Sequence, residues 1–159
     1  MIRPMKPSDV PRVAEIHVFG QRTAYRGIVS DNFLFGKMTV EKRMEYFGSY
    51  KAEGCVYDDG IVKGFITFGP CEDEDKTGSF ELYRIFVDPL MSGRGIGGKL
   101  AAHFEEVAIK RAYDEICLWV LEGNTKTRIF YEKLGYVPDG IKRLSGYFKV
   151  PEIRYIKKI

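Results

Sequence analysis

The sequence has few cysteines and histidines and no long apolar segment, and these absences exclude several classes of protein. Its three cysteines, Cys55, Cys71 and Cys117, show no C-x-x-C spacing, so neither a disulfide framework nor a zinc site is predicted. No apolar stretch approaches the roughly 20 residues of a membrane-spanning helix, and the N-terminus lacks the pattern of a signal peptide. We therefore expect buried thiols, no metal, no membrane contact and a cytoplasmic location.

The charge balance and the histidines exclude further classes. The formal net charge is only +3, and the basic residues form no cluster of the kind that nucleic-acid binding usually requires. His17 and His103 fall on predicted helices far in sequence from any nucleophile, so no Ser-His-Asp or Cys-His arrangement is indicated. We expect structural or surface histidines and no nucleic-acid partner.

The apolar residues suffice for one core. Of the 159 residues 45% are hydrophobic, which predicts a single domain over residues 1–159. Hydrophobic periodicity and turn signals such as Asp58-Asp59-Gly60 define the elements. Strands are predicted over residues 2–6, 54–57, 61–68, 80–87 and 116–121, with two more after residue 136; helices are predicted from about residue 9 to between residues 20 and 27, and over 39–47, 94–110 and 125–133. This order favours an α/β fold with a mixed sheet and helices on both faces.

A glycine-dense loop joins the fourth predicted strand to the third predicted helix. Glycines let successive backbone N–H groups approach an anion without Cβ clashes, and the following helix points its unpaired N–H groups at the same place. The candidate phosphate-binding residues are Gly93, Arg94, Gly95, Ile96, Gly97 and Gly98.

The same glycines also fit the dinucleotide pattern G-x-G-x-x-G, with Glu122 at about the expected distance downstream. In a dinucleotide site, however, the strand runs almost directly into the first glycine, whereas here residues 88–92 intervene with the strand-ending Pro89. The spacing disfavours a nucleotide-dependent oxidoreductase but leaves it as an alternative.

Two ordered motifs give the chain a resemblance to a known family. Val87-x-Pro89 precedes the loop that contains Gly95 and Gly97, and residues 124–136 read Asn-Thr-Lys-Thr-Arg-Ile-Phe-Tyr-Glu-Lys-Leu-Gly-Tyr. In this order and spacing the segments resemble the central motifs of the GNAT superfamily, the acetyl-CoA-dependent N-acetyltransferases.

The resemblance covers nearly the whole chain, because residues 24–27 and 152–155 also look like segments of GNAT proteins with unassigned acceptors. It implies a mostly antiparallel central sheet that splays between the fourth and fifth strands, with acetyl-CoA bound in the splay. Ser92 replaces the usual Gln or Arg and Thr127 the usual Ala, but neither change removes a backbone donor.

The resemblance also implies which residues bind acetyl-CoA. The glycine loop would hold the phosphates, and Asn124 would cap the last helix and contact the pantetheine arm. The backbone of the fourth strand would meet the arm and the thioester at Ile85, Phe86 and Val87.

Two side chains are implied to carry the transfer. Tyr131 would contact the cofactor and protonate the departing thiolate of CoA. Glu81 matches the position of the general-base glutamate in the histone acetyltransferase branch and would deprotonate the acceptor ammonium through water. Strict strand alternation places Glu81 on the same face of the strand as Tyr83, Ile85 and Val87. Arg84 then lies on the opposite face, and the sequence suggests no role for it.

The acceptor is not identified by the sequence. A primary amine of a small molecule or a peptide is expected, and the acidic run over residues 72–75 is interpreted as a solvated loop and not as an amine-attracting surface. A CoA-binding sensor or interaction module without turnover is an alternative, and exposed strands after residue 136 leave a homodimer open.

Overall fold

The computed structural model describes residues 1–159, and at its centre is a seven-stranded sheet with the order β1-β2-β3-β4-β5-β7-β6. The strands are β1 (Ile2–Pro4), β2 (Glu53–Asp58), β3 (Val62–Pro70), β4 (Phe80–Val87), β5 (Glu115–Leu121), β6 (Val137–Leu144) and β7 (Pro151–Lys158). The α-helices are α1 (Val10–Ala24), α2 (Val40–Ser49), α3 (Ile96–Lys110) and α4 (Thr125–Lys133). All neighbouring strands are antiparallel except β4 and β5, so the predicted mixed, mostly antiparallel sheet is confirmed.

Local sequence signals account for most element boundaries. The hydroxyl of Thr39 accepts a hydrogen bond from the backbone N–H of Lys42 and caps α2. Gly60, with φ of +112°, lets β2 turn into β3. A π-helical segment over Asn32–Lys37 lies outside the prediction, because its short Phe-Leu-Phe run carries too little periodicity to indicate a helix.

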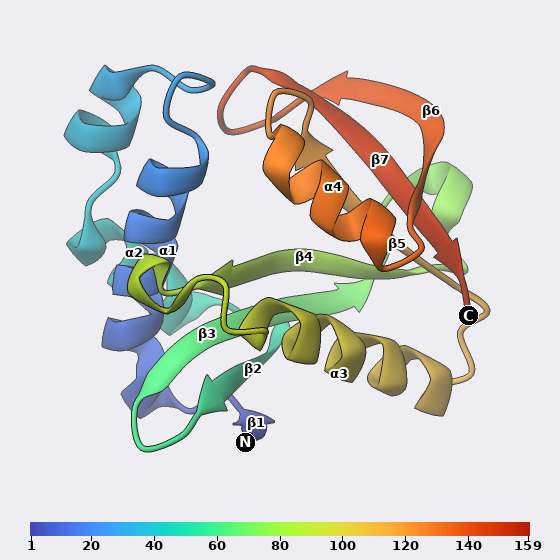
Figure 1. Cartoon of the computed structure of the whole chain (residues 1–159), viewed down its shortest axis with the longest axis horizontal. Helices are drawn as coiled ribbons and strands as arrows, with labels where there is room; N and C mark the ends of the chain where they lie inside the picture. The colour runs from blue at the N-terminus through green and yellow to red at the C-terminus, as the bar shows by residue number, and fades with distance from the viewer.

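The helices cover both faces of the sheet. α3 and α4 pack on one face through an apolar cluster that includes Leu100, Phe104 and Tyr131. α1 and α2 contribute Ile16 and Phe47 to a second cluster on the other face. In Figure 1, α3 and α4 lie in front of the strands, and α1 and α2 stand together at the left. None of the helices combines the length and the apolar character needed to cross a membrane.

The two parallel strands separate soon after they begin. β4 and β5 pair only at Phe80–Ile116, Glu81–Cys117 and Leu82–Leu118. Beyond these pairs β5 continues beside β7, whereas β4 continues beside β3. The splay implied by the family resemblance is therefore present, and its edges carry backbone groups without a strand partner (Figure 1).

A β-bulge interrupts β4 at the splay. Leu82 and Arg84 pair with consecutive residues of β3, which leaves Tyr83 as the extra residue. A bulge adds one residue to a strand and therefore reverses the alternation of side chains beyond it.

The bulge overturns the predicted alternation. Ile85 and Val87 pack toward the α3 side of the sheet, whereas Glu81, Arg84 and Phe86 line a cavity on the other side. The prediction that Glu81 shares a face with Ile85 and Val87, opposite Arg84, is wrong for this reason.

Candidate active site

The glycine loop presents a row of free backbone donors. Gly93 and Gly95 have φ values of +79° and +76°, a conformation that side-chain-bearing residues rarely adopt. The backbone N–H groups of residues 93–98, six in succession, donate no hydrogen bond within the protein. A Cβ added at Gly93, Gly95 or Gly98 would meet no other atom within 4 Å. Free donors at the start of α3, with open space above them, suit the phosphate groups of a ligand.

The surroundings of this loop differ from a dinucleotide site. A 3-10 turn over Pro89–Met91 separates β4 from the glycines, whereas a dinucleotide-binding strand leads almost directly into the first glycine. The carboxylate of Glu122 pairs with the Lys142 ammonium at 2.5 Å instead of standing free for a ribose. The structure gives the dinucleotide alternative no support.

The unpaired edge of β4 continues from the splay to the glycine loop. The residues of this edge are Ile85, Phe86 and Val87, all partly buried. Since β5 has diverged from β4 by this point, their polar backbone groups on that side are available to an extended ligand. The predicted pantetheine contacts are thus sterically possible.

Two further predicted residues have well-defined surroundings. The side chain of Asn124 is buried and accepts a hydrogen bond from the backbone N–H of Thr127 at 3.3 Å, which caps α4 as the sequence predicts. Arg94 is exposed on the loop and forms no ion pair, so its charge is free to meet a phosphate.

Tyr131 lies on the inner side of α4. It is 5% exposed, and its ring packs against the rings of Phe130 and Tyr136. Burial raises the pKa of Tyr131 well above its ordinary value, and the nearby Tyr25 raises it further. The hydroxyl therefore keeps its proton at neutral pH and can donate it.

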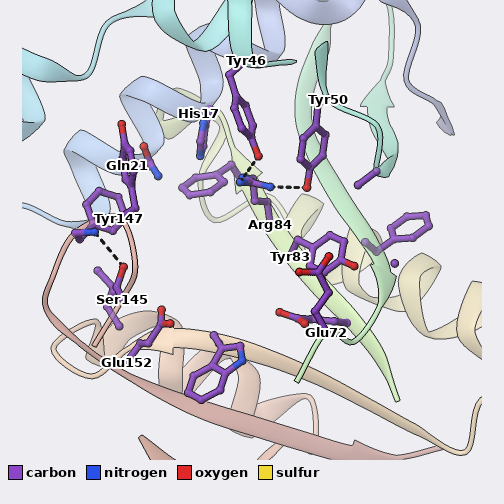
Figure 2. Close-up of a pocket in the computed structure, with 18 of the residues that line it drawn as sticks. His17, Gln21, Tyr46, Tyr50, Glu72, Tyr83, Arg84, Ser145, Tyr147 and Glu152 are labelled. Atoms are coloured by element: carbon purple, nitrogen blue, oxygen red, sulfur yellow. Dashed lines mark hydrogen bonds between the residues drawn. The ribbon is translucent and has the colours of Figure 1, made fainter. Parts of the chain in front are cut away.

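A cavity of about 940 Å³ opens on the side of the sheet opposite α3. Figure 2 shows it between the N-terminal helices, which carry His17, Gln21 and Tyr46, and the C-terminal strands, which carry Glu152. β4 forms the wall between them. Tyr25, the neighbour of Tyr131, also lines the cavity, so the cavity approaches the region of the splay.

Glu81 stands on this wall without a cationic partner. Burial is the main cause that raises the pKa of its carboxyl, and the charges of Asp73 and Glu72 raise it further. A hydrogen bond from Cys71 acts in the opposite direction. A carboxylate with a raised pKa at the edge of a cavity suits a general base.

The cysteines are free and buried, as predicted, but two of them meet at the candidate base. The sulfur atoms of Cys71 and Cys117 and a carboxylate oxygen of Glu81 all lie within 4.8 Å of one another. The hydrogen bond with Cys71, followed by burial, raises the pKa of Cys117, so that thiol stays protonated. Sequence spacing does not indicate this meeting, because it depends on the register of β4 and β5.

Arg84 lines the same cavity. Its guanidinium donates to the hydroxyl groups of Tyr50 at 2.7 Å and Tyr46 at 2.8 Å, as Figure 2 shows. No carboxylate lies within ion-pair distance of Arg84 or of Arg43, which is 8% exposed and stacks 4.7 Å from the Tyr147 ring. Two guanidinium groups therefore line the cavity without anionic partners, as does the exposed ammonium of Lys51.

The interpretation of residues 72–75 as a solvated loop is wrong for Asp73 and Asp75, which form ion pairs, whereas Glu72 and Glu74 are exposed. Asp73 accepts hydrogen bonds from Trp119, Arg143 and Arg154 at 3.0 to 3.1 Å. Asp75 forms a bidentate pair with the 2% exposed Arg154. These carboxylates fix the loop to the C-terminal strands.

His17 and Gln21 were not singled out by the sequence as site residues, yet both line the cavity. Both are at least nine-tenths buried, and His17 Nδ1 and Gln21 Oε1 lack hydrogen-bond partners. Burial, followed by the charges of Arg43 and Arg84, lowers the pKa of His17, so the imidazole is neutral. Their i, i+4 spacing on the apolar face of α1 is the signal that could have identified them.

Comparison with known proteins gives one consistent family. The model of the acetyltransferase (GNAT) family matches residues 22–136, more than half of the chain. An uncharacterized N-acetyltransferase of Bacillus subtilis is 27% identical over 88% of this chain and 80% of its own length. A spermine/spermidine N(1)-acetyltransferase of the same organism is 33% identical over 61% of this chain and 66% of its own length.

A solved structure has the same fold. The PaiA N-acetyltransferase of Thermoplasma acidophilum, determined in complex with coenzyme A, superposes with a TM-score of 0.74 and 20% sequence identity. The match covers 100% of this chain and 98% of the other. The order of elements and the splayed sheet are thus those of a known acetyltransferase fold.

Proposed function

The chain belongs to the GNAT family of acetyltransferases, which use acetyl-CoA, and we propose that it transfers the acetyl group directly to a primary amine of a small molecule or a peptide. The observation that carries this proposal is the position of Glu81, on the wall of a large cavity at the point where β4 and β5 begin to separate. The cavity would hold the acceptor, and the splay would hold the thioester.

Glu81 would prepare the acceptor for attack. An amine is a nucleophile only when it is neutral, and its ammonium form predominates at neutral pH. Because Glu81 has a raised pKa and no cationic partner, it can accept this proton, directly or through a water molecule. No covalent enzyme intermediate is required.

Tyr131 would complete the transfer at the sulfur. Its raised pKa keeps the phenol protonated, so it can supply a proton to the departing thiolate. A thiolate whose acid has a pKa of about 8.5 leaves adequately without help, so this proton is expected to accelerate the reaction and not to be indispensable.

The residues present fit acetyl-CoA. The free N–H groups of residues 93–98 would receive the phosphates, and the unpaired edge of β4 would receive the pantetheine amides. When bound, acetyl-CoA supplies the activated acetyl group. The loss of a side-chain donor at Ser92 is compensated by the backbone donors that surround it.

The acceptor class needs a separate argument. The similarity to a spermine/spermidine N(1)-acetyltransferase makes a polyamine one candidate, although that similarity spans less than two thirds of this chain. Amino acids, other small amines and peptide amines are further candidates.

Binding and turnover together test the proposal. Melting temperature is measured with acetyl-CoA, CoA and NAD(P) in parallel, since a ligand at 100 times its Kd stabilises a fold by about 2.7 kcal/mol. Thiol release from acetyl-CoA is then followed with a panel of amines, and the acetylated products are identified by mass spectrometry.

The proposal expects a shift with CoA and acetyl-CoA, none with NAD(P), and an acetylated amine. A shift with NAD(P) alone would support the oxidoreductase alternative. Tight acetyl-CoA binding with no acetylated product from any amine would support the sensor alternative. Where an acetylated amine is found, Glu81→Gln tests the role of the base, because it is expected to lower transfer while leaving CoA affinity nearly unchanged.

A further inference from the structure

The cavity carries unpaired charges of both signs at different places. Arg43 and Arg84 line the part nearest α1 and α2, and neither has a carboxylate partner. Glu72 and Glu81 line the part nearest the end of β3, and neither has a cationic partner. Figure 2 shows Arg84 and Glu72 on the two sides of Tyr83. The acceptor that fills this space must match both charges.

Apart from the exposed Lys51, which also forms no ion pair, the other charged residues of the wall are already neutralised. Arg143 pairs with Glu152 at 2.7 Å and stacks 3.7 Å over the Trp119 ring. Glu53 forms a bidentate pair with Arg111. The two arginines, the two glutamates and the exposed Lys51 are therefore the charged groups of the wall that lack an ion-pair partner.

Arg43 is buried and Arg84 is partly buried, both without an anion, which is unusual because burying an uncompensated charge is costly. Burial lowers the pKa of Arg43, and the nearby Arg84 lowers it further, so the two cations repel each other. Their present partners are neutral: Arg84 donates to two tyrosine hydroxyl groups, and both guanidinium groups lie over tyrosine rings. An anion between them would relieve this repulsion and receive several charge-assisted hydrogen bonds.

Two more polar groups of the same region lack partners. His17 Nδ1 and Gln21 Oε1 are buried at the cavity wall without hydrogen bonds. His17 is close enough to both arginines for their charges to act on it. A neutral imidazole can donate one hydrogen bond and the amide nitrogen of Gln21 two, whereas the unpartnered Gln21 Oε1 is an acceptor, so this end of the cavity offers donors beside one free acceptor.

We propose that the acceptor is a primary amine that also bears an acid group, as in an amino acid, with the ammonium directed to Glu81 and the acid group bound by Arg84 and Arg43. The inference rests on the proposed function and specifies its acceptor. Arg84 lies three positions after Glu81 along the strand, a span of about 10 Å that both side chains can shorten. A polyamine fits less well, because its second ammonium would meet the two guanidinium groups.

Matched pairs of acceptors test the inference. The wild-type protein is assayed by thiol release with L-phenylalanine against phenethylamine, with 6-aminohexanoate against hexylamine, and with 2-aminoethylphosphonate against ethylamine. The first two pairs separate α- from ω-amino acids, and the third separates phosphonate from carboxylate. Spermidine serves as the polyamine comparison. In at least one pair kcat/KM is expected to be about 10- to 100-fold higher for the amine with the acid group.

Two variants connect the preference to the arginines. Arg84→Gln is expected to lower kcat/KM for the preferred acceptor about 10- to 100-fold, mainly by raising KM. The kcat/KM for the matched amine without the acid group should stay nearly unchanged. Arg43→Gln is expected to act in the same direction and remains informative if Arg84→Gln does not fold. Lys110→Gln, an exposed change at the end of α3 and outside the cavity, is the control and is expected to leave the preference intact.

The outcomes separate the inference from the proposed function. If each amine without an acid group is acetylated with the same kcat/KM as its matched acid-bearing amine, or if spermidine is acetylated equally well, the transferase activity stands and the inference is wrong. If Arg84→Gln and Arg43→Gln fold and keep the full preference, the assignment of the anion to these residues is wrong. If acetyl-CoA binds but no amine is acetylated, the proposed function fails and the inference fails with it.

Discussion

Glu81 and Arg84 line the same cavity because Tyr83 is inserted between them as the extra residue of a β-bulge. Their positions in β4 differ by three, and without the bulge their side chains would project from opposite faces of the sheet. The bulge thus combines a candidate base and a cationic group in one wall. It also lies directly after the last β4–β5 pair, at Leu82, so it coincides with the start of the splay.

Tyr131→Phe is expected to lower kcat about 10²-fold and to leave the affinity for CoA within a factor of a few. The substitution removes one hydroxyl group from a buried ring and keeps its packing. Kinetics by thiol release and CoA titration by calorimetry measure the two effects. Tyr136→Phe is the matched control, because Tyr136 is buried in the same cluster and its hydroxyl has no hydrogen-bond partner. Equal losses in the two variants would contradict a specific role of Tyr131.

The acidic limb of the pH–activity profile should follow the environment of Glu81. The base works only when it is ionised, so the limb reports the pKa of Glu81. Burial is the largest cause that raises this pKa above its ordinary value, and the charges of Asp73 and Glu72 raise it further. Glu72→Gln removes one of these charges and should move the limb to lower pH. Cys71→Ala removes a hydrogen bond that lowers the pKa and should move the limb to higher pH.

Profiles of kcat/KM against pH measure these shifts. Glu74→Gln, an exposed change on the same loop, should leave the limb in place. If the acidic limb moves in the same direction in Glu72→Gln and in Cys71→Ala, it belongs to another group.

Glu81→Gln should stabilise the folded protein at neutral pH. Because the pKa of Glu81 is higher in the folded than in the unfolded state, the folded state resists its ionisation. Above the folded pKa this carboxylate lowers stability, and below the unfolded pKa of about 4.3 both states are protonated and the penalty disappears. The melting temperature of the variant should exceed that of the wild type at pH 8, and the difference should vanish near pH 4. A variant less stable at pH 8 would show that Glu81 contributes to the fold.

Much of the scaffold could be predicted from local sequence. The bounds of β4 and α4 agree with the strand at residues 80–87 and the helix at 125–133, since each has a clear period and a clear boundary signal. The glycine loop was recognised from residue type alone, because only glycine adopts its backbone conformation without strain.

The composition of the cavity could not be predicted in this way. The bulge at Tyr83 has no glycine or proline to mark it, so alternation misplaced Arg84. Cys71 and Cys117 are distant in sequence and meet Glu81 only through strand pairing. Local sequence predicts a solvated Asp73, because the partners that bind it come from β5, β6 and β7. Each of these features depends on contacts between distant segments.

Arg154→Met should destabilise the fold by about 3 kcal/mol. The guanidinium is 2% exposed and holds Asp73, Asp75 and Asp139 in one network, so its removal leaves Asp75 and Asp139 without a cation and Asp73 with Arg143 alone. Urea unfolding measures the loss. Arg143→Met, which removes a half-exposed neighbour from the same network, is the comparison and should cost less than 1 kcal/mol by the usual value of exposed pairs. Equal costs would contradict the central position of Arg154.

Gly98→Ala should weaken acetyl-CoA binding without weakening the fold. A Cβ at Gly98 meets no protein atom within 4 Å, and an alanine inside α3 is favourable, so the melting temperature of the free protein should stay constant or rise slightly. The added methyl group would enter the space where the free N–H groups of residues 93–98 face a phosphate. The loss of one charge-assisted hydrogen bond lowers affinity about 10-fold or more.

Calorimetric titration with acetyl-CoA measures this change. Gly48→Ala is the matched control, because it lies in α2, also in open space and away from the loop, and should leave the affinity unchanged. If Gly98→Ala binds acetyl-CoA as tightly as the wild type, the phosphates do not rest on the first turn of α3, and the anion cradle must be restricted to Gly93 and Gly95.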